Sequence, residues 1–195
     1  MFDHIGAKTR TAVFDSLPWI SRSAGLVEPV PGAEGRIYPG ARPFDGQPCD
    51  AGDYVNMSPS ETETCIAFVD MDSEIRRTRN TSRFYDFELF FRVVLWYDER
   101  KISVDASSFL FGIQSAIAAG VQAAQYDTTG IHRTKVRYDS TQLDALKVWE
   151  RYKIDQEKQG LFLLPYRSLA IRFRMIGMVT PACFTEIITA NPAAC

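Results

Sequence analysis

Alternation of apolar and polar residues is clearest between residues 83 and 97 and predicts a long β-strand there. Every odd position from 85 to 97 is apolar, whereas the even positions mix charged, aromatic and aliphatic residues. Successive side chains of a strand point to opposite faces, so one face is expected to be fully buried and the other partly covered. The apolar run 64–70 is expected to form a hairpin with this strand through a polar turn containing Arg76, Arg77 and Arg79.

Two further stretches alternate in the same way. Residues 131–138 predict an exposed or edge strand with its basic residues on one side, and residues 166–179 predict a second long strand. Oppositely charged residues of the two long strands could pair across an antiparallel ladder, at roughly 0.2 to 1 kcal/mol per pair. The basic residues of the edge strand are Arg133, Lys135 and Arg137, and the candidate pairs place Arg172 and Arg174 opposite Asp86 and Glu88.

Apolar residues at helical spacing predict three helices. The first lies within residues 3–17 and is stopped by Pro18. The second begins after Asp105, which can cap it, and carries an apolar stripe of small residues that would lie close on the sheet. The third is expected over residues 140–158, with a strongly charged outer face.

Between residues 21 and 60, prolines and glycines are too frequent for continuous regular structure, apart from a short strand at residues 35–38. A long irregular segment of this kind is usually functional or is ordered by a partner. The whole pattern predicts one α+β domain over residues 1–195. We expect an antiparallel sheet with helices packed on one face, and an extended arm at residues 21–60.

Composition and charge narrow the classes of partner. The formal net charge of -2 gives no global attraction to nucleic acid or to an anionic membrane. The N-terminal residues lack the features of a signal peptide, and the most apolar stretch, residues 109–124, is too short and too interrupted to cross a bilayer. No membrane contact is therefore expected.

Candidate chemistry is sparse. The four cysteines are scattered without a C-x-x-C pair, and only two histidines could join them, so free thiols rather than a zinc site are expected. His4 lies in the first predicted helix and His132 in a basic strand without a carboxylate nearby in sequence, and no phosphate-binding glycine loop or nucleophile elbow is found. The sequence therefore predicts no enzyme, no cofactor and no metal. One alternative is kept, a metal-dependent enzyme that uses Asp70, Asp72, Asp86 and Glu88.

Two basic features could contact DNA if many copies displayed them together. They are the cluster Arg76, Arg77 and Arg79 and the strand residues Arg133, Lys135 and Arg137. If the protein formed a ring, a modest patch on each subunit would become a positive collar around a channel.

Three segments define the order of the predicted elements. They are FYDFELFFRVVLWY at residues 84–97, the helix from Asp105, and LAIRFRM at residues 169–175. That order resembles the tail terminator and tail-completion proteins of tailed bacteriophages. The resemblance implies a virion structural protein assembled in the host cytoplasm. It would form a ring, such as a hexamer, that joins the tail tube to the head connector and meets other neck or tail proteins, with the arm as interface. The candidate interface residues are Phe84, Phe90, Trp96, Tyr38, Phe44 and Tyr54.

A second alternative is a monomeric module that binds a peptide or protein through its sheet face and its proline-rich arm. Native mass would separate this reading from the ring, and metal-dependent turnover would test the enzyme.

Overall fold

The computed structural model describes residues 2–41, 54–80, 84–102, 106–128, 130–154 and 160–180. Within the strands and helices, it does not describe the side chains of residues 72–75, 77–80 and 106–107. The described strands form one mixed sheet of seven, in the order β3-β2-β1-β4-β5-β7-β6. The predicted α+β fold is confirmed. The strands are β1 (Arg22–Pro31), β2 (Ile37–Ala41), β3 (Val55–Asn56), β4 (Cys65–Asn80), β5 (Tyr85–Asp98), β6 (Ile131–Gln142) and β7 (Tyr166–Val179), and the helices are α1 (Phe2–Val13), α2 (Ala106–Ala123) and α3 (Ala145–Val148).

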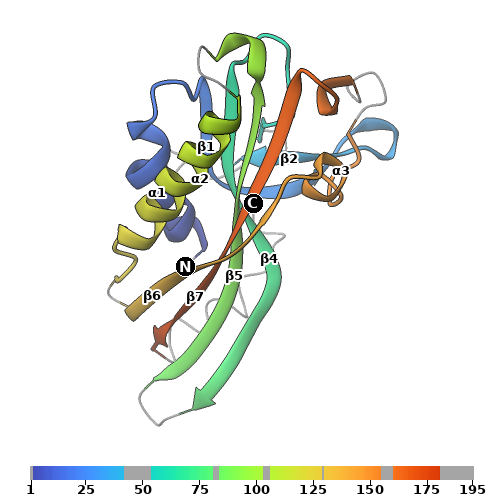
Figure 1. The fold of residues 1–195 in the computed structure, drawn as a ribbon. Helices are drawn as coiled ribbons and strands as arrows, with labels where there is room; N and C mark the ends of the chain where they lie inside the picture. Colours follow the sequence, from blue (N-terminus) through green and yellow to red (C-terminus); the bar gives the residue numbers. More distant parts are fainter. Residues whose placement is uncertain are drawn as a thin grey trace.

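Strand β5 is the centre of the sheet, as the alternation predicts. It pairs antiparallel with β4 on one side and with β7 on the other along its whole length (Figure 1). Strand β6 pairs with β7 and is an edge strand, also as predicted. The hairpin of β4 and β5 is confirmed, but the predicted turn is wrong. Residues 76–80 continue β4 and pair with residues 85–88 of β5, with a bulge between Arg77 and Arg79.

The irregular arm predicted for residues 21–60 is wrong over much of its length, because β1 and β3 also lie within it. The short strand expected at residues 35–38 is present as β2, which begins at Ile37. The prolines are tolerated because β1 leaves its neighbour β4 at Val27, before Pro29 and Pro31, where a missing N–H would break that ladder. Strand β1 runs parallel to β4, so the sheet is not purely antiparallel as expected. A parallel neighbour requires a long connection, and the chain through β2 and β3 supplies it.

The third predicted helix is also wrong over most of its length. Residues 140–142 pair with β7 as the end of β6, and within the described residues 143–154 only the single turn α3 is helical. Residues 155–158 of the predicted helix lie outside the described residues. The apolar residues after α3 are buried nonetheless, since Val148, Trp149 and Tyr152 pack on the sheet. The apolar residues spaced three apart therefore lie on one helical turn and the irregular chain after it, rather than on a continuous helix.

The sheet has a core on each face. The odd positions of β5 face α1 and α2, together with odd positions of β4 and β7. The even positions Val94 and Trp96 face a second, smaller core formed by α3 and the chain that follows it. The helices are therefore not all on one face as predicted: α1 and α2 lie on one side and α3 on the other (Figure 1). Cys65 is buried as a free thiol in the first core, as expected.

Helix α1 lies against β1 at a backbone contact between two glycines. A Cβ atom on Gly6 would lie 2.3 Å from the backbone nitrogen of Leu26, and one on Gly25 would lie 3.1 Å from the carbonyl carbon of Gly6. Both positions are buried. The close approach therefore depends on the absence of a side chain at each position.

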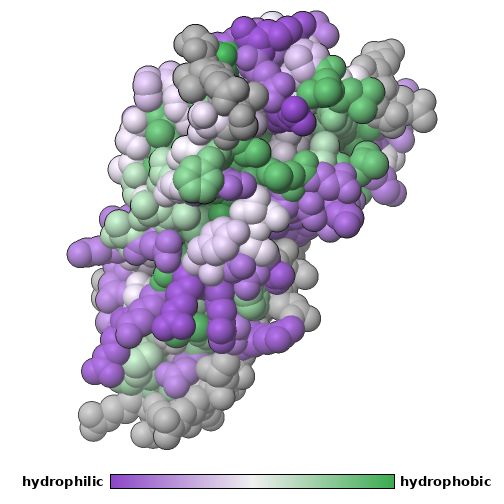
Figure 2. All heavy atoms as spheres, in the orientation of Figure 1, coloured by the Kyte–Doolittle hydropathy of each residue, from purple (hydrophilic) through white to green (hydrophobic). Residues whose placement is uncertain are grey.

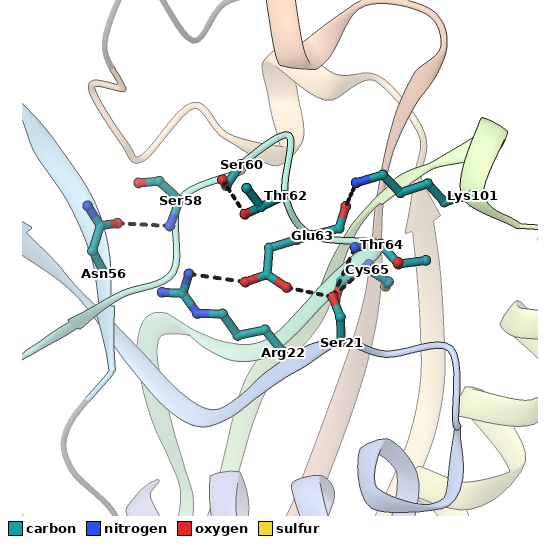
Figure 3. A network of polar contacts seen from close by, with 10 residues as sticks. All are labelled: Ser21, Arg22, Asn56, Ser58, Ser60, Thr62, Glu63, Thr64, Cys65 and Lys101. Atoms are coloured by element: carbon teal, nitrogen blue, oxygen red, sulfur yellow. Dashed lines mark hydrogen bonds and ion pairs between the residues drawn. The ribbon is translucent and has the colours of Figure 1, made fainter.

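A polar network ties the start of β4 to the start of β1 (Figure 3). The Ser21 hydroxyl accepts hydrogen bonds from the amides of Thr64 and Cys65, at 3.0 and 3.2 Å, and lies 2.7 Å from Glu63 Oε2. Lys101 donates to the carbonyl oxygens of Glu61 and Glu63 from the far side. The network satisfies backbone groups where β1 and β4 begin to pair, so it helps to set their parallel register.

Candidate functional site

The face of the sheet that carries α3 is polar beyond the second core, and we call this part the charged face. It is formed by even positions of β5 and β7 and by the residues of β4 and β6 paired with them. Figure 2 shows hydrophilic residues gathered over β6 and the lower part of the sheet. The described charged residues of this face are Arg76, Asp86, Glu88, Arg92, Lys135, Arg137, Arg172 and Arg174, with Asp139 at its rim.

A bulge in β6 changes which of its residues share this face. His132, Lys135 and Arg137 pair with Met178, Ile176 and Arg174, all even positions of β7. The predicted grouping of Arg133 with Lys135 and Arg137 is therefore wrong, because the extra residue between His132 and Lys135 reverses the alternation.

Arg133 lies inside the bulge, with a positive φ of 54°. Its amide donates to Asp127 Oδ2 at 3.1 Å, and the Thr134 hydroxyl donates to Asp127 Oδ1 at 2.6 Å. Hydrogen bonds from Thr134, first from its hydroxyl and then from its amide, lower the pKa of Asp127. An ionised Asp127 therefore holds the bulge in place.

The predicted cross-strand ion pairs are confirmed in one case. Arg174 Nε lies 2.7 Å from Glu88 Oε1. Arg172 does not pair with Asp86 as expected. Its guanidinium carbon lies 4.3 Å from the centre of the Phe90 ring, and its Nε lies 3.8 Å from Asp139. The difference follows from the register, which places Arg172 opposite Arg92 in β5 and Ser140 in β6, beside the Asp139 bulge.

The basic cluster Arg76, Arg77 and Arg79 lies on strand β4, and the structure describes the side chain of Arg76. Arg76 is exposed and is paired in register with Glu88. The side chains of Arg77 and Arg79 lie outside the described residues, as does the whole of Phe44. The structure therefore brings Arg76 onto the same face as Lys135 and Arg137, with β5 and β7 between them.

Trp96 is not a surface residue, so its assignment to an interface between subunits is wrong. Its side chain is fully buried in the second core, its indole N–H donates to the Leu161 carbonyl oxygen at 2.5 Å, and its ring stacks on Tyr166 at 5.2 Å. The segment that follows α3 covers this side chain.

The other candidate interface residues within the described part of the chain are half-buried. The Phe84 ring meets His132 edge-on at 5.9 Å, Phe90 lies beneath Arg172, and the Tyr54 hydroxyl donates to Glu28 at 3.5 Å. Tyr38 is half-buried on β2. Their role at an interface stays a prediction.

Asp70 forms a buried ionic centre at the boundary between the charged face and the second core. Its carboxylate accepts from Arg92 and from Arg151, each at 2.5 Å, and only 1% of its side chain is exposed. Arg151 also donates to the Met71 carbonyl oxygen, which fastens the segment after α3 to β4. Burial first, and then the charge of Asp70, raise the pKa of Tyr152 well above its ordinary value.

From the sequence, Asp70 was one of four acidic residues considered as ligands of a metal-dependent enzyme. In the structure, both carboxylate oxygens of Asp70 bind arginines. Across the described ranges there is no group of three or more histidine, cysteine, aspartate or glutamate residues placed to hold a metal ion. The signal for the arginine contact was the hairpin register, which places Asp70 opposite Arg92.

Two exposed apolar surfaces lie on opposite faces of the sheet, and the sequence reasoning missed both. The first is the outer side of α2, where Phe111 is 72% exposed and is followed by exposed small residues at Gly112, Ser115, Ala116 and Ala119. Helix α2 contains no charged residue in 18 positions. Figure 2 shows white to pale green atoms over this helix.

The second surface, which we call the leucine patch, surrounds α3 and the turn before β7. Trp149 and Phe162 bring these two segments together, with ring centres 5.5 Å apart. Figure 2 shows hydrophobic residues gathered there. The patch consists of Leu143, Leu146, Leu163 and Leu164, which are between 51% and 77% exposed.

Comparison with known proteins does not assign this site. No model of a protein family matches the chain, and a search of curated proteins finds no significant relative. None of the helices in the described ranges has the length and apolar character needed to cross a bilayer.

Proposed function

We propose that this protein is a structural protein that assembles head-to-tail with copies of itself into a ring. The observation that carries the proposal is the pair of apolar surfaces on opposite faces of one sheet, the outer side of α2 and the leucine patch. Exposed apolar patches of this kind mark protein interfaces. A helix that is apolar on all sides is normally buried, and α2 carries no charge, its polar residues being serines and glutamines.

Two different apolar surfaces on one subunit favour a head-to-tail contact over a twofold one. In a twofold dimer, one patch meets itself, and the second patch would remain exposed. In a head-to-tail contact, α2 of one copy covers the leucine patch of the next, and repetition closes a ring when the rotation permits. The projecting Phe111, flanked by small residues, is suited to insertion between leucine side chains.

This proposal agrees with the resemblance to tail terminator and tail-completion proteins. We accordingly propose a role as a virion ring at the neck or at the head-proximal end of a phage tail, where it would join the tail tube to the connector. The competing hypothesis is a monomeric module that uses one of the two apolar surfaces for a different protein.

The native mass of the purified protein across a concentration series tests the ring. We expect a closed species of defined copy number, and we expect Phe111→Asp or Leu146→Asp to convert it to monomer, because each places a charge in an apolar contact. Val55→Asp changes another exposed apolar residue outside both surfaces and should leave the mass unchanged. Circular dichroism would verify that all three variants are folded.

Mixing the two variants gives a sharper test. A Phe111→Asp subunit retains its leucine patch, and a Leu146→Asp subunit retains its α2 surface, so a one-to-one mixture should form a heterodimer. Neither variant should dimerise alone. A wild-type protein that stays monomeric at every concentration, or a mass unaffected by both substitutions, would refute the proposal and favour the monomeric module.

A further inference from the structure

Two cations of the charged face have no acidic partner within the described ranges. Lys135 and Arg137 are both exposed, and neither takes part in an ion pair there. They lie two residues apart on edge strand β6 and, because of the bulge at Arg133, on the same face as Arg174. This local positive charge belongs to a chain whose formal net charge is -2.

The neighbouring strand extends the cluster. Arg137 is the register partner of Arg174, and Arg172 lies two residues further along β7 on the same face. Adjacent strands lie about 4.8 Å apart, and residues two apart on one strand lie about 6.7 Å apart. The four cations therefore form a short array across two strands, which we call the basic quartet: Lys135, Arg137, Arg172 and Arg174.

The two arginines of β7 are held in place by their surroundings. Glu88 fixes the guanidinium of Arg174 from β5, and the Phe90 ring supports that of Arg172. Ordering a long side chain before binding reduces the entropy lost when it meets a ligand. The quartet thus combines two positioned guanidinium groups with two exposed cations that have no acidic partner in the described ranges.

We propose that the basic quartet binds the phosphate groups of a nucleic-acid backbone. Arginine matches phosphate oxygens with paired N–H donors, and lysine adds a point charge. An array spread over an open sheet face suits an extended, repeating anion better than a single small one, and binding through phosphates alone is independent of base sequence. The inference goes beyond assembly and applies to a single subunit, although a ring would repeat the quartet around its circumference.

Binding of a labelled duplex DNA, measured at several salt concentrations, tests this inference. Each neutralised phosphate contributes about 0.9 to the slope of log affinity against log salt. The double variant Lys135→Gln/Arg137→Gln should therefore reduce that slope by about 1.8 relative to wild type. A matched control, Lys8→Gln/Lys153→Gln, removes two exposed charges, one from α1 and one from the segment after α3, and should leave the slope unchanged.

Equal slopes for the two double variants would overturn the proposal, as would the absence of DNA binding by the wild-type protein at low salt. Polyglutamate of similar length is the second probe. If it bound as tightly as DNA, the face would recognise acidic chains in general rather than phosphates. Native mass measured on the same samples keeps this result separate from the ring, because the β6 substitutions lie outside both apolar surfaces.

Discussion

Replacing Asp70 by asparagine is expected to lower the free energy of unfolding by about 3 to 5 kcal/mol, the loss typical of breaking a buried ion pair from one side. The substitution preserves the size of the side chain but removes the charge that balances Arg92, whose side chain is 11% exposed. Arg151 also loses its carboxylate partner. Urea unfolding at one fixed protein concentration would measure the loss.

Two further variants distinguish the loss of stability caused by an unpaired buried charge from the loss caused by poorer packing. Arg151→Gln should cost much less than Asp70→Asn, because the Arg151 side chain is 29% exposed and its pairing is partly replaced by water. The double variant Asp70→Leu/Arg92→Met should recover most of the stability, since apolar residues can replace a buried pair at little cost. A loss below about 1 kcal/mol for Asp70→Asn, typical of exposed pairs, would show that water reaches Arg92.

Replacing Trp96 by alanine is expected to cost about 3 to 5 kcal/mol of stability through the cavity it leaves. The substitution also leaves the Leu161 carbonyl oxygen without its indole donor and removes the ring that stacks on Tyr166. Thermal unfolding followed by circular dichroism would measure the change. Phe90→Ala is the matched control on the same face of β5, and it should cost less because Phe90 is only half-buried.

The same pair of variants distinguishes a core residue from an interface residue. If Trp96 supports the core, the folded fraction of Trp96→Ala should retain the oligomeric mass of the wild type. Unchanged unfolding combined with a loss of oligomer would return Trp96 to the interface and contradict its burial in the structure.

The central strands could be predicted from the sequence because their periodicity is long. Fourteen residues of alternation in β5 are difficult to accommodate in any other structure, and the stripe of α2 through Ile113, Ile117 and Val121 is similarly regular. Predictions from shorter patterns were wrong where pairing with another strand determined the local structure. Residues 140–142 are strand because β7 lies beside them, and β1 tolerates its prolines because it leaves β4 before them.

The charged face could be predicted only in part. Arg174 and Glu88 lie on strands whose alternation was visible, so their pairing was anticipated. The bulge at Arg133 inserts a single residue and leaves no clear sign in the alternation, so the grouping of Lys135 with His132 was missed. Arg151 contacts Asp70 across 81 residues of sequence, a distance at which no local pattern gives a signal. The apolar surfaces were missed because the sequence shows which residues are apolar but not which of them another segment of the chain covers.

The position of β7 has a consequence for the order in which this protein folds. Strand β7 lies between β5 and β6, both of which precede it in the chain, so it completes the sheet only after they have been synthesised. Pairing between distant segments forms slowly because the intervening loop must first be closed. A nascent chain that stops before Tyr166 would leave one edge of the 14-residue β5 open, and such an edge pairs readily with other chains. Ribosomal pausing within the segment between β6 and β7 should therefore increase aggregation more than pausing after Val179.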